Sequence, residues 1–525
     1  RAGLLHLLNE AADRGHLFLP RRELVERGTE LLEVQPELLE AAVADLASKK
    51  EVVVEPLPPG HRQAPGQAVY PAPLHAAEAG IGDKLLELVE RGDQDPRLDV
   101  PRALSWVADR YDLDLAPEQR RAIERGLTAP VLVVTGGPGT GKTTLVRGIV
   151  EILTKKQRKV LLAAPTGRAA QRLSEATGME ARTVHRLLEY NPMTRGFERG
   201  PDRPLVADLV VIDEVSMLDV HLAHSVLKAL PEDARLLLVG DADQLPSVGP
   251  GRVLGDMIDS GKIEIVRLTQ IFRQAQKSLI VTNAHRIHQG QMPIWPTEAG
   301  RASDFYFIDR QTPEDALAAL VEVVTRRIPG SFGYDPVNEV QVLTPMNRGL
   351  LGTENLNATL KELLNPKQGG RLEVVRGRKS FRVGDKVMQV KNNYDLGVWN
   401  GDVGKILAID PDDEEVTVAF EERVVKHDLN SLDELVPAYA CSIHKSQGSE
   451  YPCVVLVLSS QHWVMLERNL LYTALTRAKK LAVVIGETRA LGAAVRNQRQ
   501  RRRYSLLAER LRGGPFSSDT RRRGS

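Results

Sequence analysis

The chain has 525 residues, 42% of them hydrophobic and 26% charged, which allows about three or four globular domains and excludes a peptide or mini-domain. Its 70 basic and 69 acidic side chains leave a formal charge of +1, so any nucleic-acid surface has to be a local basic track. The only two cysteines, Cys441 and Cys453, exclude a disulfide framework and a cysteine-based zinc site, which favours a reducing, cytoplasmic compartment.

The sequence contains no uninterrupted apolar run of about eighteen residues, and its first residues, RAGLLHLLNEAADRG, carry charges within the apolar stretch. We therefore expect neither a membrane span nor a secretory signal. The first residue is Arg rather than Met, which suggests that the sequence is a fragment of a longer chain.

Apolar periodicity at the amino terminus predicts short amphipathic helices near 2–13, 21–31 and 36–49, followed by the β-rich segments EVVVEPL and AVYPAPL. This order resembles a winged helix, and a further helix is expected at 77–92. We therefore expect a helical, winged-helix-like domain over residues 1–110. Its role stays open between a docking module for DNA or protein and a packing domain that binds nothing.

From about residue 111, short apolar strands alternate with helical stretches. The first set is VLVVTG (131–136), KVLLAAP (159–165), LVVIDE (209–214) and LLLVGD (236–241), and the second is EVQVLTP (339–345), CVVLVLS (453–459) and LAVVIG (481–486). Strands that are buried on both faces of a parallel sheet have this composition. The pattern predicts an α/β domain over 111–275 and a second one assembled from 276–370 and 436–513, with a cleft between them.

Two insertions and a tail interrupt or follow these domains. Residues 371–435 alternate Val and Gly with charges and turn signals, which predicts a small antiparallel barrel of SH3-like size. Within it, Tyr394 and Trp399 could serve as base-stacking platforms or as core. The polar insertion 190–206 predicts a protruding β-hairpin, and 514–525 is expected to be a basic, flexible tail.

The strongest chemical signal is GGPGTGKT (136–143), which directly follows a strand and precedes a helical stretch. The spacing of Gly136, Gly141, Lys142 and Thr143 matches a phosphate-binding loop, whose glycines let backbone N–H groups approach the phosphates of a nucleotide. The Lys142 ammonium would neutralise phosphate charge, and the Thr143 hydroxyl would hold Mg²⁺. A nucleoside triphosphate is the expected ligand.

The segment LVVIDE ends a buried apolar strand with two carboxylates. Asp213 would bind the magnesium through its water, and Glu214 is placed to take a proton from the water that attacks the γ-phosphate. Together with the phosphate-binding loop, this pair predicts a nucleoside-triphosphate hydrolase, a core that several unrelated motor and signalling classes share.

Seven further segments narrow the class. They are LAPEQRRAI (115–123), APTGRAAQRL (164–173), TVHRLL (183–188), GDADQLPSVGPG (240–251), LTQIFRQ (268–274), AYACSIHKSQGSEY (438–451) and LLYTALTRAKK (470–480). In this order the chain resembles superfamily 1 DNA helicases, and more closely the RecD-like branch in its longer, stand-alone form. The resemblance spans about 110 to 490 and implies two RecA-like parallel-sheet domains.

The resemblance implies specific roles in the ATP site. Gln119 would pair with the adenine edge, and Gln244 would sense the γ-phosphate and couple it to bound DNA. The implied ATP-binding set is Gln119, Gly136, Gly137, Pro138, Gly139, Thr140, Gly141, Lys142, Thr143, Thr144 and Glu450, and the implied catalytic set is Lys142, Asp213, Glu214, Gln244, Arg273 and Arg477.

Arg273 and Arg477 also have a physical interpretation that does not depend on the family. Both lie outside the sheet that carries the phosphate-binding loop, so they can reach the γ-phosphate only when the two domains close. A guanidinium there stabilises transition-state charge, which predicts hydrolysis gated by domain closure.

A single strand of DNA would have to cross both domains. The candidates are Thr166, Arg168 and His185 in the first, and Asn347, Arg348, Thr353, His444, Lys445, Ser446 and Gln447 in the second. Thr, Ser, Asn and Arg suit phosphate contacts, which position a strand without reading its sequence.

We therefore expect an ATP- and Mg²⁺-dependent helicase that moves 5′ to 3′ on single-stranded DNA and unwinds duplex in DNA repair or recombination. Direction, and a strand-splitting role for the hairpin 190–206, are implied by the resemblance alone. Expected partners are single-stranded DNA and its junctions with duplex, with a single-stranded-DNA-binding protein as a further candidate and a monomeric state. Two alternatives stay open: a translocase that strips proteins without unwinding, and a slow regulatory NTP switch.

Overall fold

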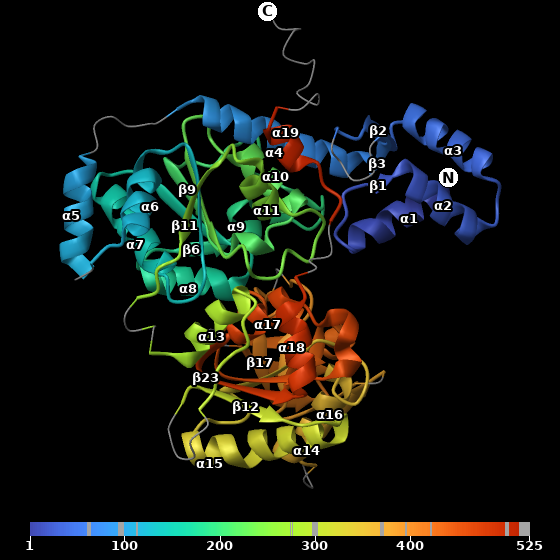
Figure 1. Ribbon diagram of the computed structural model, residues 1–525. Coiled ribbons are helices and arrows are strands. Elements are labelled where there is room, and N and C mark those ends of the chain that lie inside the picture. The colour runs from blue at the N-terminus through green and yellow to red at the C-terminus, as the bar shows by residue number, and fades with distance from the viewer. Residues whose placement is uncertain are drawn as a thin grey trace, which may run out of the picture.

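The structure is a computed structural model that describes residues 1–59, 65–92, 99–111, 114–272, 275, 277–296, 303–367, 372–377, 379–393, 396–420, 423–498 and 503–513. Arg273, Tyr394 and the tail 514–525, all named above, lie outside these residues. Two parallel sheets, one above the other in Figure 1, confirm the expected α/β fold class with two RecA-like domains. Among the described helices, none combines the length and the apolar character that crossing a membrane requires.

The first lobe is built on a six-stranded parallel sheet. Its order is β11 (Glu264–Leu268), β4 (Val131–Gly136), β10 (Arg235–Gly240), β9 (Leu209–Ile212), β5 (Val160–Ala164) and β6 (Ala181–Thr183). The four central strands are apolar almost throughout because helices cover both faces. These helices include α6 (Pro117–Thr128), α7 (Lys142–Lys155), α8 (Gly167–Thr177), α10 (Val220–Ala229) and α11 (Val253–Ser260). The parallel arrangement brings the segments that follow β4, β9 and β10 to one edge of the sheet.

The second lobe has a five-stranded parallel sheet made of segments from both sides of the barrel insertion, as expected. Its order is β12 (Phe305–Asp309), β23 (Ala478–Gly486), β22 (Tyr451–Leu458), β13 (Val340–Thr344) and β21 (Ala440–Ser442). The flanking helices include α13 (Leu279–His288), α14 (Pro313–Glu322), α16 (Thr353–Leu364), α17 (Arg468–Leu475) and α18 (Thr488–Arg496). Edge strand β12 was not predicted from the sequence.

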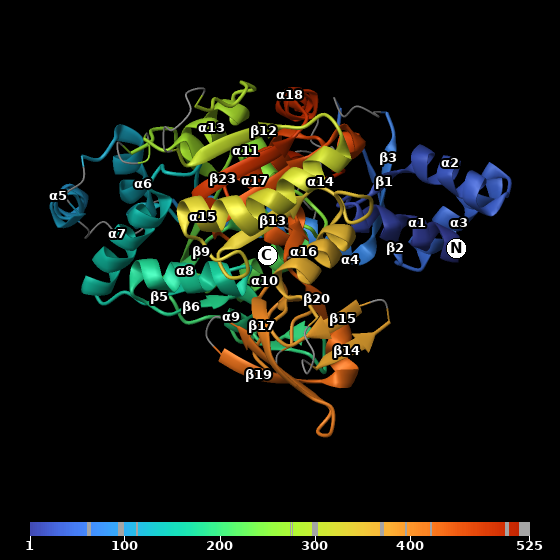
Figure 2. The ribbon, with the colours of Figure 1, turned by 90° about the horizontal axis from the view of Figure 1, so that it is seen from below.

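The insertion forms antiparallel strands, as predicted, and lies at one end of the second lobe in Figure 2. The strands are β14 (Glu373–Arg376), β15 (Lys379–Arg382), β16 (Lys386–Gln389), β17 (Val403–Asp410), β18 (Glu415–Phe420), β19 (Arg423–Asp428) and β20 (Leu435–Pro437). The buried Lys361 ammonium on α16 lies 2.8 Å from the Asp385 carboxylate and fixes the barrel to the second lobe. Trp399 of the barrel packs on Gly167 at the start of α8, so the barrel also touches the first lobe.

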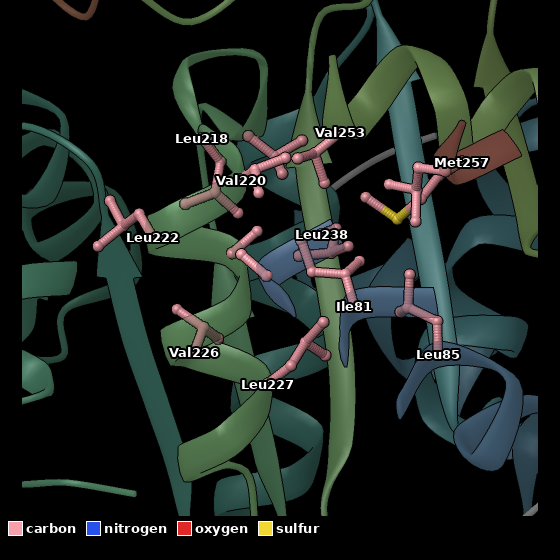
Figure 3. Packing of buried hydrophobic residues seen from close by; sticks show 14 of the residues in the cluster. Ile81, Leu85, Leu218, Val220, Leu222, Val226, Leu227, Leu238, Val253 and Met257 are labelled. Atoms are coloured by element: carbon pink, nitrogen blue, oxygen red, sulfur yellow. The ribbon is translucent and has the colours of Figure 1, made fainter. Parts of the chain in front are cut away.

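The amino-terminal domain has the order and the sheet of a winged helix. Helix α1 (Ala2–Asp13) and strand β1 (Leu19–Pro20) come first, followed by helices α2 (Arg21–Leu32) and α3 (Pro36–Ser48) and strands β2 (Val52–Pro56) and β3 (Gln67–Pro71). The three strands form an antiparallel sheet in the order β1, β3, β2. The long helix α4 (Ala72–Glu90) then joins this domain to the first lobe. In Figure 3, Ile81 and Leu85 of α4 lie beside Leu227 of α10, Leu238 of β10 and Met257 of α11, within one continuous core.

Two segments pack elsewhere than the domain boundaries expected from the sequence. Helix α5 (Val100–Tyr111) was assigned to the amino-terminal domain, but its Val107 packs on Gly148 of α7, within the first-lobe core. Residues 503–513 were assigned to the second lobe, yet Leu507 and Leu511 of α19 (Leu507–Leu511) join the core of α4 and α11. In both cases apolar side chains of a short helix pack against the core of the first lobe.

A buried carboxyl pair lies where the carboxy-terminal segment meets α4 and α11. The Ser505 hydroxyl oxygen is 2.8 Å from Glu78 Oε1 and 2.6 Å from Asp256 Oδ2, but the hydroxyl has one proton to donate. Burial raises the pKa of Asp256 to about 7, with Arg252 opposing this shift. A protonated Asp256 that donates to Ser505, which in turn donates to Glu78, satisfies all three groups.

This arrangement predicts a pH-dependent contribution to stability. Because the folded-state pKa lies above the ordinary value, Asp256 stabilises the fold most at acidic pH, and the contribution is lost as pH rises through about 7. We expect Asp256→Asn to be more stable relative to wild type at pH 8 than at pH 5, by on the order of 2 kcal/mol. Thermal unfolding at both pH values measures this, with Asp259→Asn, which is half exposed on the same helix, as the control. An equal difference at both pH values would contradict it.

Candidate nucleotide site between the lobes

The phosphate-binding loop has a backbone that requires glycine. Gly139 and Gly141 have φ of 74° and 86°, in the left-handed region. A Cβ on Gly141 would overlap the Phe272 ring, which lies directly over the loop, and a Cβ on Gly136 would come within 2.8 Å of the Leu268 carbonyl. The buried Thr140 hydroxyl closes the turn by donating to the Gly137 carbonyl at 2.9 Å. The result is a preformed cradle at the amino terminus of α7, where helix dipole and backbone N–H groups attract anions.

Lys142 points back onto this loop. Its Nζ donates to the carbonyls of Gly136 at 2.5 Å and Gly137 at 3.0 Å. Thr143, the next residue, is exposed and lines the groove described below. The ammonium group is therefore held at the place where phosphate oxygens could replace carbonyl oxygens as its partners.

The two carboxylates after β9 lie where the sequence predicts them. Asp213 Oδ1 accepts a hydrogen bond from the Glu214 N–H at 2.8 Å. Burial and the neighbouring Glu214 carboxylate raise the pKa of Asp213 to about 6. Glu214 itself has a left-handed backbone with φ of 52°, a conformation that costs energy for a residue with a side chain. A partly buried acidic pair held at this cost fits a site that receives a cation and a reacting water.

A groove of about 1440 Å³ contains these groups and opens between the two lobes. It brings together most of the residues that the sequence assigned to the ATP site, namely Gln119, Gly137, Pro138, Gly139, Thr140, Gly141, Lys142, Thr143, Thr144, Asp213, Glu214, Gln244, Glu450 and Arg477. Gly136 adjoins it through the carbonyl that binds Lys142. Residues from both lobes therefore face one cavity of a size that suits a nucleotide.

Gln119 is buried and anchored beside the loop. Its Oε1 accepts from the Ala116 N–H at 3.0 Å, and its Nε2 donates to the Thr140 carbonyl at 3.1 Å. The side chain thus ties the start of α6 to the phosphate-binding loop. Recognition of adenine by the remaining hydrogen-bonding capacity of the amide stays a prediction.

The segment after β10 reaches across to the second lobe. Gln244 Nε2 donates to Asp241 at 3.3 Å, and the Tyr472 hydroxyl of the second lobe donates to the same Asp241 oxygen at 2.7 Å. One residue further, the Leu245 N–H donates to the Thr473 hydroxyl at 2.9 Å. Sequence reasoning missed Asp241 and Tyr472, because only the folded chain brings them together.

Arg477 comes to the groove from the second lobe. The side chain is buried and donates to the carbonyls of Thr473 at 3.2 Å and Ser449 at 3.1 Å. It lines the same groove as Lys142 but belongs to the other lobe, and its approach to a nucleotide stays a prediction. Arg273 lies outside the described residues, so its role stays a prediction.

Arg172, which the sequence analysis did not select, connects the lobes at the groove. It lies on α8, and its guanidinium is 2.6 Å from Glu450, donates to the Gly448 carbonyl at 2.5 Å, and is 3.6 Å from Glu214. Burial alone would raise the pKa of Glu450, but Arg172, Arg477 and Lys479 together hold it below the usual value. A first-lobe cation thus neutralises one carboxylate from each lobe.

Removing this cation is expected to weaken ATP binding. In Arg172→Ala, Glu214 and Glu450 would face the phosphates without their shared partner, so the KM for ATP should rise. In Arg172→Ala/Glu450→Gln the rise should be smaller than the product of the single effects, by a coupling on the order of 1 kcal/mol. Steady-state ATPase kinetics on both single variants and the double variant measure this coupling. Lys479→Ala, which removes a longer and half-exposed contact to Glu450, serves as the control, and strictly multiplicative effects would contradict the coupling.

The first-lobe DNA candidates lie on the side of α8 and the hairpin. Thr166 caps α8 by accepting from the Ala169 N–H at 3.3 Å, and the Arg168 guanidinium lies 5.5 Å from the centre of the Tyr451 ring. The His185 ring instead packs against Tyr190 and Phe197 of the hairpin, with ring centres within 5.7 Å. Burial lowers the pKa of His185, so it carries little positive charge for a phosphate at neutral pH.

The second-lobe candidates divide into exposed and buried groups. Asn347 and Arg348 are exposed beside Thr353 at the start of α16, and Lys445 is exposed next to the half-buried His444. Ser446 and Gln447 are buried, and their contact with DNA stays a prediction. The Ser446 hydroxyl donates to the Ile443 carbonyl, and Gln447 Nε2 donates to the Leu245 carbonyl at 2.9 Å. Gln447 therefore joins the two lobes.

The phosphate-binding loop follows a strand of one RecA-like sheet, and an arginine from the lobe of the second sheet lines the same groove. This arrangement is typical of two-lobed motors that are driven by a nucleotide. Comparison with known families agrees. Three family models match the chain: an AAA domain over residues 119–250, the SH3 domain of ATP-dependent RecD-like DNA helicases over 356–420, and a UvrD-like helicase carboxy-terminal domain over 437–485.

Two sequence relatives and one solved structure are similar to this chain over most of its length. The ATP-dependent RecD2 DNA helicase of Deinococcus radiodurans is 36% identical over 502 residues, which cover 95% of this chain and 66% of that protein. The RecBCD enzyme subunit RecD of Mycolicibacterium smegmatis is 31% identical over 426 residues, 75% of each chain. A crystal structure of Pif1 helicase from Bacteroides in complex with ADP-AlF3 and ssDNA has 21% identity and a TM-score of 0.43, covering 71% of this chain and 92% of that one.

The chain therefore belongs to the RecD-like family of superfamily 1, the ATP-dependent DNA helicases. It spans just under two thirds of the length of the Deinococcus protein.

Proposed function

We propose that this chain is the motor of a helicase that moves 5′ to 3′ on single-stranded DNA and unwinds duplex during DNA repair or recombination. One observation carries the motor function: a single groove has Lys142 of one lobe on one side and Arg477 of the other lobe opposite. The direction and the pathway rest on similarity to the RecD-like family.

ATP hydrolysis would use the groups that line the groove. Lys142 would exchange its two carbonyl partners for phosphate oxygens, and Glu214 would accept the proton of the attacking water. The Thr143 hydroxyl and the Asp213 carboxylate would hold Mg²⁺, and the raised pKa of Asp213 fits a carboxyl group that a cation would stabilise in its charged form. Such an ion, when bound, neutralises charge on the phosphates.

Movement would come from closure of the lobes around the nucleotide. Several contacts already cross between them, including Leu245 to Thr473 and Gln447 to Leu245. Because ATP would bind the closed arrangement more tightly than the open one, binding and hydrolysis would alternate the two arrangements. The exposed candidates Asn347, Arg348 and Lys445 would hold the strand on the second lobe, and Thr166 and Arg168 on the first.

The hairpin β7 (Tyr190–Asn191) to β8 (Gly196–Phe197) would split the duplex. Phe197, an aromatic residue of β8, packs on Tyr190 and His185 at the base of the hairpin. Met193, in the turn between the strands, is 92% exposed and is the apolar side chain that a base pair would meet. A thioether of this kind adapts to an irregular surface such as the end of a base-pair stack.

Unwinding of duplexes that carry either a 5′ or a 3′ single-stranded tail, with ATP and magnesium, tests the function. We expect unwinding with the 5′ tail and little with the 3′ tail. The reverse preference would contradict the proposed direction, and ATP hydrolysis that single-stranded DNA does not stimulate would contradict the motor and favour the slow NTP switch.

A shortened hairpin tests how the duplex is split. Replacing residues 191–196 by two glycines removes the tip and keeps Tyr190 and Phe197, whose rings pack at the base. We expect loss of strand separation with DNA-stimulated ATP hydrolysis retained. Unwinding at the wild-type rate would show that another element separates the strands. A wild-type chain that displaces bound proteins but leaves duplex intact would favour the translocase.

A further inference from the structure

The carboxy-terminal residues Arg503 and Tyr504 lie between the winged-helix domain and the first lobe. The Leu17 N–H donates to the Tyr504 carbonyl at 2.8 Å, and the Tyr504 N–H donates to His16 Nδ1 at 3.1 Å. The Tyr504 ring stacks on Phe18 with centres 5.3 Å apart. These contacts attach the segment to the turn that follows α1.

Arg503 extends from this segment to the loop after β10. One guanidinium nitrogen donates its two hydrogens to the carbonyls of Gly249 at 2.8 Å and Gly251 at 2.7 Å, and it lies 3.2 Å from the Ser247 hydroxyl oxygen. The other donates to the Ser247 carbonyl at 2.6 Å. A planar, multi-donor group matches this set of acceptors, whereas a lysine ammonium would satisfy only part of it.

The same loop is also bound directly by the winged-helix domain. The Gly251 N–H donates to the Gly15 carbonyl at 3.0 Å. Gly15 has φ of 92°, and a Cβ there would overlap the Arg503 guanidinium. The amino-terminal turn, the carboxy-terminal segment and the loop Ser247–Gly251 thus form one packed joint.

The other end of this loop is the segment that couples the lobes. Leu245 binds Thr473 and Gln447 of the second lobe, and Gln244 lines the nucleotide groove. Only Pro246 separates Leu245 from Ser247, and its ring fixes one of the two soft backbone angles. A shift of Ser247 would therefore be expected to displace Leu245 and Gln244 as well.

The third helix of the winged-helix domain argues against phosphate binding as that domain's role. In a DNA-reading winged helix this element enters the groove of the duplex, but α3 carries Glu37, Glu40 and Asp45 and neither Lys nor Arg. Glu40 pairs with Arg21, and Asp45 pairs with Arg1 and Lys49, so α3 itself offers no cationic side chain to a phosphate.

We infer that Arg503 is a positioning residue for the coupling segment Gln244–Ser247, and that the winged-helix domain acts on ATP turnover through it. Arg503 does not line the groove, so its effect would pass through the backbone of that segment. This inference rests on the proposed function, because its readout is DNA-stimulated ATP hydrolysis.

The test compares Arg503→Ala, Arg503→Lys and the control Arg512→Ala in the full chain. Arg512 belongs to the same segment and donates to the Asp259 carbonyl on α11, away from the coupling loop. We expect Arg503→Ala to lower kcat in saturating single-stranded DNA by on the order of tenfold. Its KM for ATP should stay within about twofold of wild type, because the cradle is untouched. Arg503→Lys should recover part of kcat, and Arg512→Ala should behave like wild type.

A second variant changes the same contact from the side of the winged-helix domain. Gly15→Ala would displace the Arg503 side chain without removing it, so it should also lower kcat more than KM, and it decides the matter if Arg503→Ala does not fold. Equal kcat values in Arg503→Ala and Arg512→Ala, or a wild-type kcat in a folded Gly15→Ala, would overturn the inference. Absence of DNA stimulation in the wild-type chain would instead count against the proposed function.

Discussion

Arg477→Ala is expected to lower kcat for DNA-stimulated ATP hydrolysis by roughly 10³-fold or more, the range that arginine fingers contribute in related phosphoryl transfers. The reason is geometric: Arg477 lines the groove from the lobe opposite Lys142, so its charge would meet the γ-phosphate only if the lobes close on a bound nucleotide. Nucleotide affinity should change only a few fold, because the phosphate-binding loop is intact. Fluorescent-nucleotide binding and single-turnover hydrolysis measure the two effects separately.

Because Arg477 is buried and donates to two carbonyls, alanine could also loosen the second lobe. Arg477→Lys keeps the charge and most of the volume and should fall between alanine and wild type in kcat. Arg489→Ala, an exposed arginine on the same lobe, is the matched control. If affinity and kcat fell in parallel in both Arg477 variants, the residue would serve the fold rather than the transition state.

Lys142→Ala is expected to reduce kcat by roughly 10²- to 10³-fold, the usual effect of removing one preorganised donor to developing charge. Affinity for ATP should fall as well, since the ammonium would contact phosphate in the ground state too. Titration with labelled nucleotide and steady-state hydrolysis measure both quantities.

Lys156→Ala removes an exposed lysine just past the carboxy-terminal end of the same helix and should leave both quantities near wild type. If Lys142→Ala hydrolysed ATP at the wild-type rate, this groove would not be the site of ATP hydrolysis. Unchanged ATP affinity with reduced kcat would show that the ammonium acts only in the transition state.

Much of the first lobe was predictable because its signals are local. The strand before Gly136 and the strand before Asp213 are short apolar runs with polar residues at their ends, and parallel packing then brings both ends to one edge of the sheet. The glycines of the loop need no distant partner to fix their conformation.

The contacts between the lobes could not be predicted in this way. Arg172 and the Gly448 carbonyl are 276 residues apart, and nothing in either segment specifies the other. The burial of Ser446 was unpredictable for a different reason. It lies in a short 3₁₀ helix, Ile443–Ser446, whose period of about three places it on the same buried face as Ile443. Because the sequence pattern did not reveal this short helix, it did not indicate that a polar residue beside an exposed lysine would be buried.

The polypeptide passes between the lobes twice, once between β11 and α13 and again between α18 and α19. Two covalent crossings restrict the relative motion of two bodies more than one crossing does, because the chain ends on both sides of each crossing must stay within reach of each other. If the lobes open and close during turnover, the second lobe should therefore stay attached to the first at both places and have fewer paths to follow than a lobe joined by a single linker.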